Sequence, residues 1–261
     1  MNHSDPTPND GKAGTLLSHL VELRSRLLKS VAAVLVLFLG FAPFANDLYT
    51  VVAAPLMQHL GGDASMIATQ VASPFLTPFK LSLVLAIFAS MPVVLYQLWA
   101  FVAPGLYSQE RRFAIPLLLT SILLFYAGIA FAYFIVFPLM FGFFTAVAPT
   151  GVTVMTDIAH YLDFVLMLFF AFGLAFEVPI ATVLLVWAGI TTPSKMSGKR
   201  PFVFLGAFIA GMMLTPPDVV SQLLLAFPIY LLFEAGIILA RVIVPGHREV
   251  EAQQAGADAE K

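Results

Sequence analysis

The side chains best suited to chemistry in this chain of 261 residues are a few carboxylates that lie beside or inside long apolar runs. Glu22 belongs to the stretch His-Leu-Val-Glu-Leu-Arg-Ser-Arg-Leu, residues 19–27, and Arg26 follows it at the spacing of neighbours on one helix face. The leucines of this stretch also recur at helical spacing, so we predict an amphipathic turn lying against a membrane. The alternative is an ordinary surface ion pair worth about 0.3–0.5 kcal/mol.

Glu110 belongs to a polar hinge, residues 101–112, that separates two long apolar runs. Pro104 and Gly105 explain why helix ends here, because proline restricts the residue before it and glycine favours a turn. The hinge therefore predicts a carboxylate and two guanidinium groups at a membrane surface. The alternative to a ligand site is that the two arginines after Glu110 neutralise it.

Glu177 lies midway along an apolar run, within Phe-Gly-Leu-Ala-Phe-Glu-Val-Pro-Ile. A carboxylate at that depth costs about 2.5–3.5 kcal/mol even on lenient insertion scales, and so indicates a functional site by default. We expect Glu177 to face a wet cavity or to be protonated.

A fourth candidate is the turn between the last two apolar runs. Pro216, Pro217 and Asp218 form its tip, and Asp218 is placed to cap the helix that follows. Capping alone is a sufficient explanation for that aspartate. Thr215, Ser221 and Gln222 remain as polar groups at or just inside the hydrocarbon edge, where membrane helices use such residues as contact points.

Other kinds of site are weakly supported or excluded. Asp157, His160 and Asp163 have the spacing of metal ligands, but they enter an apolar run from a loop, and a solvated loop is the simpler interpretation. We predict no metal and no cofactor. The chain has no cysteine, which excludes thiol catalysis and disulfides. All five histidines lie outside the apolar runs and no P-loop or His-Glu-x-x-His motif occurs, so we expect no enzyme.

The composition requires an all-α integral membrane protein to hold these residues. Hydrophobic residues make up 60% of the chain and charged residues 11%, whereas a globular protein has about 45–50% apolar residues. A net charge of −2 without a basic face argues against nucleic-acid binding. The predicted transmembrane segments are Leu28–Phe44, Leu81–Val102, Phe113–Met140, Phe164–Ile190, Phe202–Leu214 and Val219–Leu239.

The fifth of these six segments is too short to cross a bilayer by itself. A helix needs about 20 residues to span about 30 Å, and this segment reaches only about 20 Å. We therefore predict a short hairpin of the fifth and sixth segments. Pro92, Pro116, Pro179 and Pro228 lie inside the segments and bend their helices, which predicts a kinked, cupped bundle.

The basic residues predict the orientation. All of the 13 lysines and arginines except Lys80 fall on one side of the predicted spans, so both termini are expected in the cytoplasm. We divide the chain into a cytoplasmic tail with the amphipathic turn (1–26), a transmembrane domain (27–241) and a disordered cytoplasmic tail (242–261). The region 46–79 becomes an outward loop, and its part from Met66 to Phe79 is predicted as an interfacial cap.

In the stretches 19–27, 101–112, 176–179 and 214–222 the sequence resembles the TatC subunit of the twin-arginine protein translocase, and they occur in that family's order. The resemblance runs from about His19 to Arg241. It implies a receptor and core component that exports folded proteins across the cytoplasmic, or inner, membrane, driven by the proton-motive force. It also implies an oligomeric assembly with the single-span partners TatA and TatB.

The resemblance further implies roles for individual residues. Glu22 and Glu110 would receive the twin arginines of the cargo's signal peptide, with Phe101 and Arg24 nearby. Glu177 would be the polar group inside the concave face. Met212, Thr215 and Gln222 would contact TatA and TatB. Pro216, Pro217 and Asp218 would shape the tip of the hairpin.

The chemistry of arginine supports the same assignment. Arginine presents a planar fork that matches a carboxylate bidentately, whereas lysine is a point charge. Fully exposed pairs contribute only about 0–1 kcal/mol each, which is too little to sort cargo. We therefore infer partly desolvated pairs and a groove for the apolar segment of the signal.

A secondary transporter of a small solute is the alternative function, since it would also need kinked helices and an intramembrane carboxylate. The sequence has no evident internal repeat, and its motifs gather at the predicted cytoplasmic surface and the outer hairpin. Both observations favour the translocase.

Overall fold

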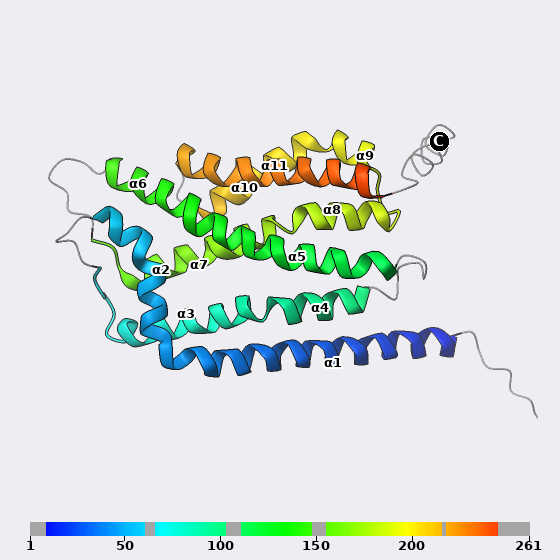
Figure 1. Cartoon of the computed structure of the whole chain (residues 1–261), viewed down its shortest axis with the longest axis horizontal. Helices are drawn as coiled ribbons and strands as arrows, with labels where there is room; N and C mark the ends of the chain where they lie inside the picture. Colours follow the sequence, from blue (N-terminus) through cyan, green and yellow to red (C-terminus); the bar gives the residue numbers. More distant parts are fainter. Residues whose placement is uncertain (1–8, 61–65, 103–110, 148–154, 216–217, 245–261) are drawn as a thin grey trace, which may run out of the picture. The chain divides into compact units, whose positions relative to one another are not determined.

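The described part of the chain is helical, as the composition predicted (Figure 1). The computed structural model describes residues 9–60, 66–102, 111–147, 155–215 and 218–244, and side chains for all of these except 9–19, 59–60, 102 and 111–114. Within these ranges the only extended pairing is an isolated bridge between Ile67 and Asp157. The helices are α1 (Asn9–Phe41), α2 (Ala45–Leu60), α3 (Ser73–Ala89), α4 (Met91–Val102), α5 (Arg111–Phe131), α6 (Phe137–Val147), α7 (Ile158–Ala175), α8 (Val178–Trp187), α9 (Pro193–Gly198), α10 (Arg200–Leu214) and α11 (Val219–Ile243).

Several helical stretches are long and apolar enough to cross a membrane. Within the described ranges four qualify alone, and α3 with α4 qualifies as one span bent by 46°. Helix α10 is apolar but has only 15 residues, which confirms the short fifth segment. Each predicted segment overlaps one of these stretches, so the multi-span helical fold is confirmed, while six crossings remain a prediction. The four long stretches are Leu20–Gln58, Ile115–Val147, Ile158–Trp187 and Val219–Ile243.

One predicted boundary is wrong. The region 46–79 is not all loop, because it contains most of α2 and the first turns of α3. Hydropathy hid α2, whose apolar residues Val52, Ala53 and Leu56 are buried on one face while Pro55 lies inside the helix. The stretch 19–27 is helical, as its spacing predicted, and belongs to α1 without a break; its position against a membrane stays a prediction.

The prolines act differently from one another. Pro92 and Pro179 each lie at the second position of a helix, directly after a break, as expected of a residue that lacks a backbone donor. Pro116 and Pro228 lie inside α5 and α11, which continue past them. The predicted bend is therefore confirmed at Pro92, where α3 and α4 meet at 46°, and a helix break precedes Pro179.

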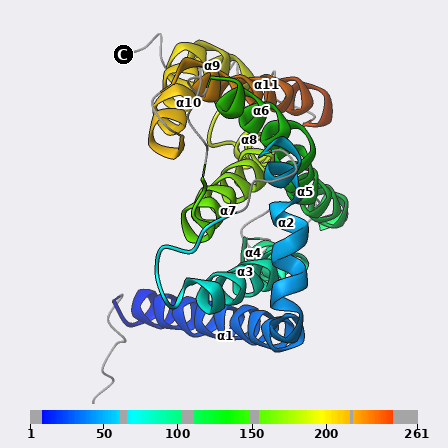
Figure 2. The same ribbon diagram turned by 90° about the vertical axis from the view of Figure 1, so that its left-hand side faces the viewer.

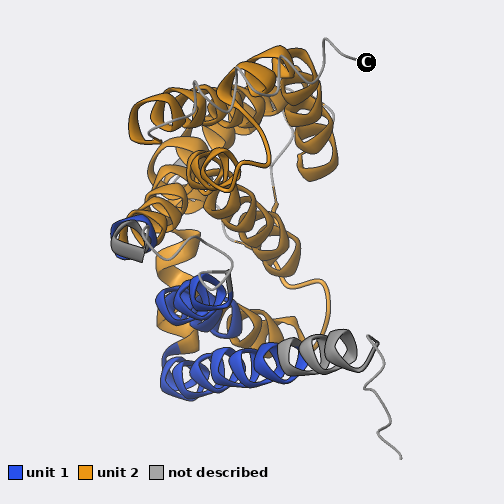
Figure 3. Cartoon of the chain, turned by 90° about the vertical axis from the view of Figure 1, so that its right-hand side faces the viewer, with its two compact units in different colours: residues 1–44, 82–118 blue, residues 45–81, 119–261 orange. Residues whose placement is uncertain are grey.

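The chain forms two compact units (Figure 3): residues 1–44 with 82–118, and residues 45–81 with 119–261. In the first unit α1 packs against α4. In the second, α11 packs against α8 and α10, side by side in Figures 1 and 2, and α2 packs against α6. Phe125, Phe137 and Phe172 are among the largest fully buried side chains of the second unit.

Candidate functional site

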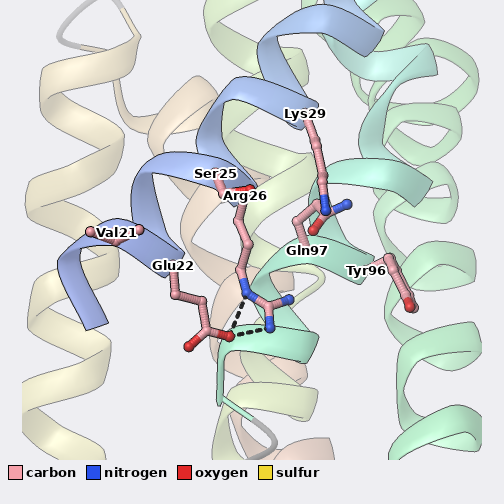
Figure 4. Close-up of a pocket in the computed structure, with 7 residues that line it drawn as sticks. All are labelled: Val21, Glu22, Ser25, Arg26, Lys29, Tyr96 and Gln97. Carbon is pink, nitrogen blue, oxygen red and sulfur yellow. Dashed lines mark hydrogen bonds and ion pairs between the residues drawn. The ribbon is translucent and has the colours of Figure 1, made fainter. Parts of the chain in front are cut away.

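An open hollow of about 650 Å³ lies between α1 and α4, and Glu22 is in its wall (Figure 4). Glu22, Arg26 and Lys29 reach it together because positions i, i+4 and i+7 share one face of a helix. Helix α4 adds Tyr96 and Gln97. The volume falls in the range of about 300–1,000 Å³ that is typical of ligand pockets. The lining is completed by Val21 and Ser25.

The Glu22 carboxylate is already engaged by Arg26 of the same helix, as the spacing predicted. Nε of Arg26 donates to Oε1 of Glu22 at 3.1 Å, and Nη2 donates to the same oxygen (Figure 4). The pair is partly exposed, with 37% of the Glu22 side chain and 20% of the Arg26 side chain accessible. Among the described residues nothing donates to Oε2, and the side chain is part-exposed, so this oxygen is open to another donor.

The charged side chains of the hollow are one carboxylate and two cations, because Lys29 joins Arg26. Lys29 points toward Gln97 (Figure 4). Its ammonium forms no ion pair with any residue in the described ranges. The described part of the hollow thus carries a net positive charge, which is unexpected in a site for a cationic ligand.

The other predicted signal-binding residues have different positions. Arg24 is exposed, and it is two positions from Glu22, so the two side chains do not face one another on α1. Phe101 is half-buried in the last turn of α4. Glu110 is in the stretch 103–110, outside the described residues, and its place beside Glu22 stays a prediction.

Glu177 lies at a break in a long apolar stretch, between α7 and α8. The break follows from Pro179 at the second position of α8, and the Glu177 amide bonds to the Leu174 carbonyl at 3.1 Å, a tightened turn. Oγ of Ser121, from α5, donates to Oε2 of Glu177 at 2.5 Å. Oε1 is buried and has no partner among the described residues. Sequence analysis missed Ser121, whose only signal was a hydroxyl in an apolar run.

The hairpin of α10 and α11 holds the predicted partner-binding residues. Met212 is 55% exposed, whereas Thr215 is buried and its hydroxyl donates to the Gly211 carbonyl at 2.9 Å. Gln222 is half-buried, and its backbone lies close to Gly211, where an added Cβ would stand 3.5 Å from the Gln222 carbonyl. Thr215 therefore serves its own helix, while Met212 is open to a partner.

The predicted cap by Asp218 is confirmed, since its Oδ1 accepts from the Ser221 amide at 2.7 Å. Asp218 Oδ2 and Ser221 Oγ are buried without a hydrogen-bond partner in the described part of the chain. Pro216 and Pro217 are not among the described residues. The tip of the hairpin thus keeps polar atoms whose bonding is incomplete within the described chain.

Asp157 is not the solvated loop residue that the sequence indicated. It is 9% exposed, and its carboxylate accepts from the hydroxyl and amide of Thr69 at 2.7 and 2.8 Å and from the amides of Ala159 and His160. The Thr69 hydroxyl bond, with the three amide bonds, holds the pKa of Asp157 far below its usual value. Asp157 thereby ties the segment before α3 to the start of α7. No described group of three histidine, aspartate or glutamate residues converges on a metal position.

This carboxylate predicts a pH-dependent stability. Because the folded pKa of Asp157 is depressed, its stabilising contribution is complete above the unfolded value of 3.8 and is lost as the pH falls below it. Asp157→Asn should therefore lower the thermal unfolding temperature at pH 7, and the gap to the parent should narrow below about pH 3.8. Thermal unfolding in detergent, recorded over a range of pH, measures the unfolding temperature of the variant and its gap to the parent. The control is Asp163→Asn, which breaks an exposed pair with Lys80 worth about 0–1 kcal/mol; a gap that is constant with pH contradicts the assignment.

Comparisons with known proteins agree with the fold. A family model described as TatC, Sec-independent protein translocase protein, matches residues 18–228. Proteins of the same description are similar to this chain: that of Azotobacter chroococcum mcd 1 is 58% identical over 95% of this chain and 97% of its own length. The protein of Escherichia coli K12 is 57% identical over 90% of this chain and 92% of its own length.

A solved structure supports the same family. The structure described as "Crystal Structure of Twin Arginine Translocase Receptor- TatC" matches with a TM-score of 0.76 at 39% identity, and covers 86% of this chain and 98% of that chain. The four stretches on which the resemblance rested all lie inside the range that the family model matches. The chain therefore belongs to the TatC family, whose members are membrane components of the Sec-independent protein translocase and not enzymes.

Proposed function

We propose that this chain is the receptor of a twin-arginine translocase in the cytoplasmic membrane. It recognises signal peptides with consecutive arginines and, with TatA and TatB, exports folded proteins at the expense of the proton-motive force. One observation carries the proposal: a part-exposed carboxylate, Glu22, lies in an open hollow and binds a guanidinium there. The similarity to a solved protein described as a twin arginine translocase receptor supports it. Membership of the TatC family argues against the alternative function, a secondary transporter of a small solute.

The proposed orientation rests on the distribution of the lysines and arginines along the chain. Both termini lie in the cytoplasm, so the start of the first span and the end of α4 meet at the cytoplasmic surface. The hollow contains residues from both, Glu22 near the start of the first apolar stretch and Gln97 near the end of α4. Signal peptides therefore reach Glu22 from the side on which they are made. Glu110, in the hinge that follows α4, supplies the second carboxylate.

The partners TatA and TatB dock on the hairpin of α10 and α11. Met212 offers an exposed apolar side chain, and Gln222 a polar one, on neighbouring helices. The buried, incompletely bonded atoms of Asp218 and Ser221 lie at the same end of the hairpin. A photoreactive residue at position 222 should give adducts with these partners, and its failure to do so removes the hairpin from the assembly.

The receptor role is tested by photocrosslinking from the hollow. A photoreactive residue at Val21, which is 67% exposed in its wall, should form an adduct with a signal peptide that carries Arg-Arg. Exchange of Arg-Arg for Lys-Lys, or of Glu22 and Glu110 for glutamine, should reduce the adduct at least about fivefold, the loss of about 1 kcal/mol. The yield is measured on gels with labelled peptide.

The matched control places the same photoreactive residue at Leu39, equally exposed but further along α1. Its adducts should not depend on the arginines of the peptide. Equal adducts at Val21 with and without the two carboxylates would rule out a receptor site in this hollow.

A further inference from the structure

The arrangement around Glu22 suggests how the receptor limits access to its own carboxylate. The guanidinium of Arg26 makes with Oε1 of Glu22 the contact that a signal-peptide arginine would make. The contact is part-exposed, and it joins residues four apart on one helix, a kind of pair that is weak and readily opened. Arg26 therefore occupies the ligand position without closing it permanently.

The charges of the hollow indicate whether a ligand arginine displaces Arg26 from Glu22 or shares Glu22 with it. If a ligand arginine shared Glu22 with Arg26, two guanidinium groups would meet at one carboxylate group, beside the Lys29 ammonium. Like charges at such distances repel one another. If Arg26 instead swings away, one guanidinium replaces another and the local charge is unchanged. The long flexible stem of Arg26 and the open mouth of the hollow permit this exchange.

We propose, building on the proposed receptor function, that Arg26 is a built-in surrogate ligand, which holds Glu22 in the resting receptor and is displaced by an arginine of the signal peptide. The apparent affinity of any cationic ligand then equals its intrinsic affinity multiplied by the fraction of receptors in which Glu22 is free. The factor is the same for Arg-Arg and Lys-Lys peptides, because the cost of releasing Arg26 does not depend on what replaces it. A common penalty moves weak lysine ligands below useful occupancy and leaves arginine ligands above it.

The test measures the dissociation constants of labelled Arg-Arg and Lys-Lys signal peptides for the full chain in lipid nanodiscs, by fluorescence anisotropy. Arg26→Gln should tighten the binding of both peptides by the same factor, about twofold to fivefold, the value for one part-exposed pair. Arg26→Lys, which keeps the charge but loses the fork, should give a smaller increase. The double variant Glu22→Gln with Arg26→Gln should bind like Glu22→Gln alone, since nothing is left to release.

Two controls separate this inference from its rivals. Lys199→Gln removes one exposed cation elsewhere in the chain; if it tightens binding as much as Arg26→Gln, the effect is bulk charge and the surrogate role is overturned. If Arg26→Gln instead weakens the binding of the Arg-Arg peptide and reduces its preference over the Lys-Lys peptide, Arg26 helps to hold the ligand at Glu22. That result also overturns the surrogate role. If Glu22→Gln leaves Arg-Arg binding unchanged, the receptor site itself is wrong, a result distinct from both.

Discussion

Transport by a Glu177→Leu variant is expected to fall at least about tenfold, equivalent to about 1.4 kcal/mol, while its thermal unfolding temperature stays level or rises. The carboxylate has one described donor, Ser121, and its second oxygen is buried without a partner in the described chain. A carboxylate inside the hydrocarbon region costs about 2.5–3.5 kcal/mol on insertion scales, so leucine relieves the fold. We propose that this cost is retained because Glu177 serves as a polar contact for an inserting signal or partner helix. Stability and function should then change in opposite directions.

The measurements are transport of a folded reporter into inverted membrane vesicles and thermal unfolding of the purified variant. Glu177→Gln is the matched control, since it keeps the size and the acceptor for Ser121 but loses the charge. If a polar side chain is what transport requires, Glu177→Gln should transport more than Glu177→Leu. If an ionisable side chain is required, the two variants should transport equally poorly. Full transport by the leucine variant, or its loss together with the fold, contradicts a specific role for this carboxylate.

Gly128→Ala is expected to cost about 3 kcal/mol of unfolding free energy, at the upper end for an overpacked core, and to lower the unfolding temperature by roughly 5 °C or more. A Cβ on Gly128 would stand 2.4 Å from the backbone carbonyl oxygen of Phe172 and 3.1 Å from Cβ of Phe176. A backbone atom cannot rotate away as a side chain can, so α5 and α7 must separate. Phe131, whose ring lies 5.4 Å from that of Phe172, would lose contact with it.

The control for this prediction is Gly206→Ala in α10. A Cβ on Gly206 meets nothing within 4 Å, so alanine should be neutral or stabilising by up to about 1 kcal/mol through helix propensity. Thermal unfolding of both variants in one detergent gives the comparison. Equal unfolding temperatures would mean that α5 and α7 are not held together at this glycine.

Local pairings in this protein could be predicted from the sequence. The Glu22–Arg26 pair and the Asp218 cap involve residues four and three apart, and helix geometry alone brings such residues together. The break before Pro179 is local in the same sense, because proline removes a donor wherever it stands. Hydropathy was sufficient for the spans, but it missed α2, where a short apolar face alternates with polar residues and Pro55.

Contacts between distant elements could not be predicted. Ser121 and Glu177 are 56 residues apart, and Thr69 and Asp157 are 88 apart. Both oxygens of Glu234 accept from Arg200, 34 residues earlier in the chain, at 2.6 and 2.7 Å. None of these pairings has a sequence signal, because any carboxylate of an apolar run could meet any donor on another helix.

The sequence by itself therefore determined the class of protein, its family and the residues that face one another within a turn of helix. Tertiary structure decided which oxygen of Glu177 is bonded, that Asp157 is buried, and how closely α5 approaches α7 at Gly128. The reason is the range of the interactions: spacing and capping act within about four residues, whereas the register of one helix on another is the sum of many weak packing contacts spread along the whole chain.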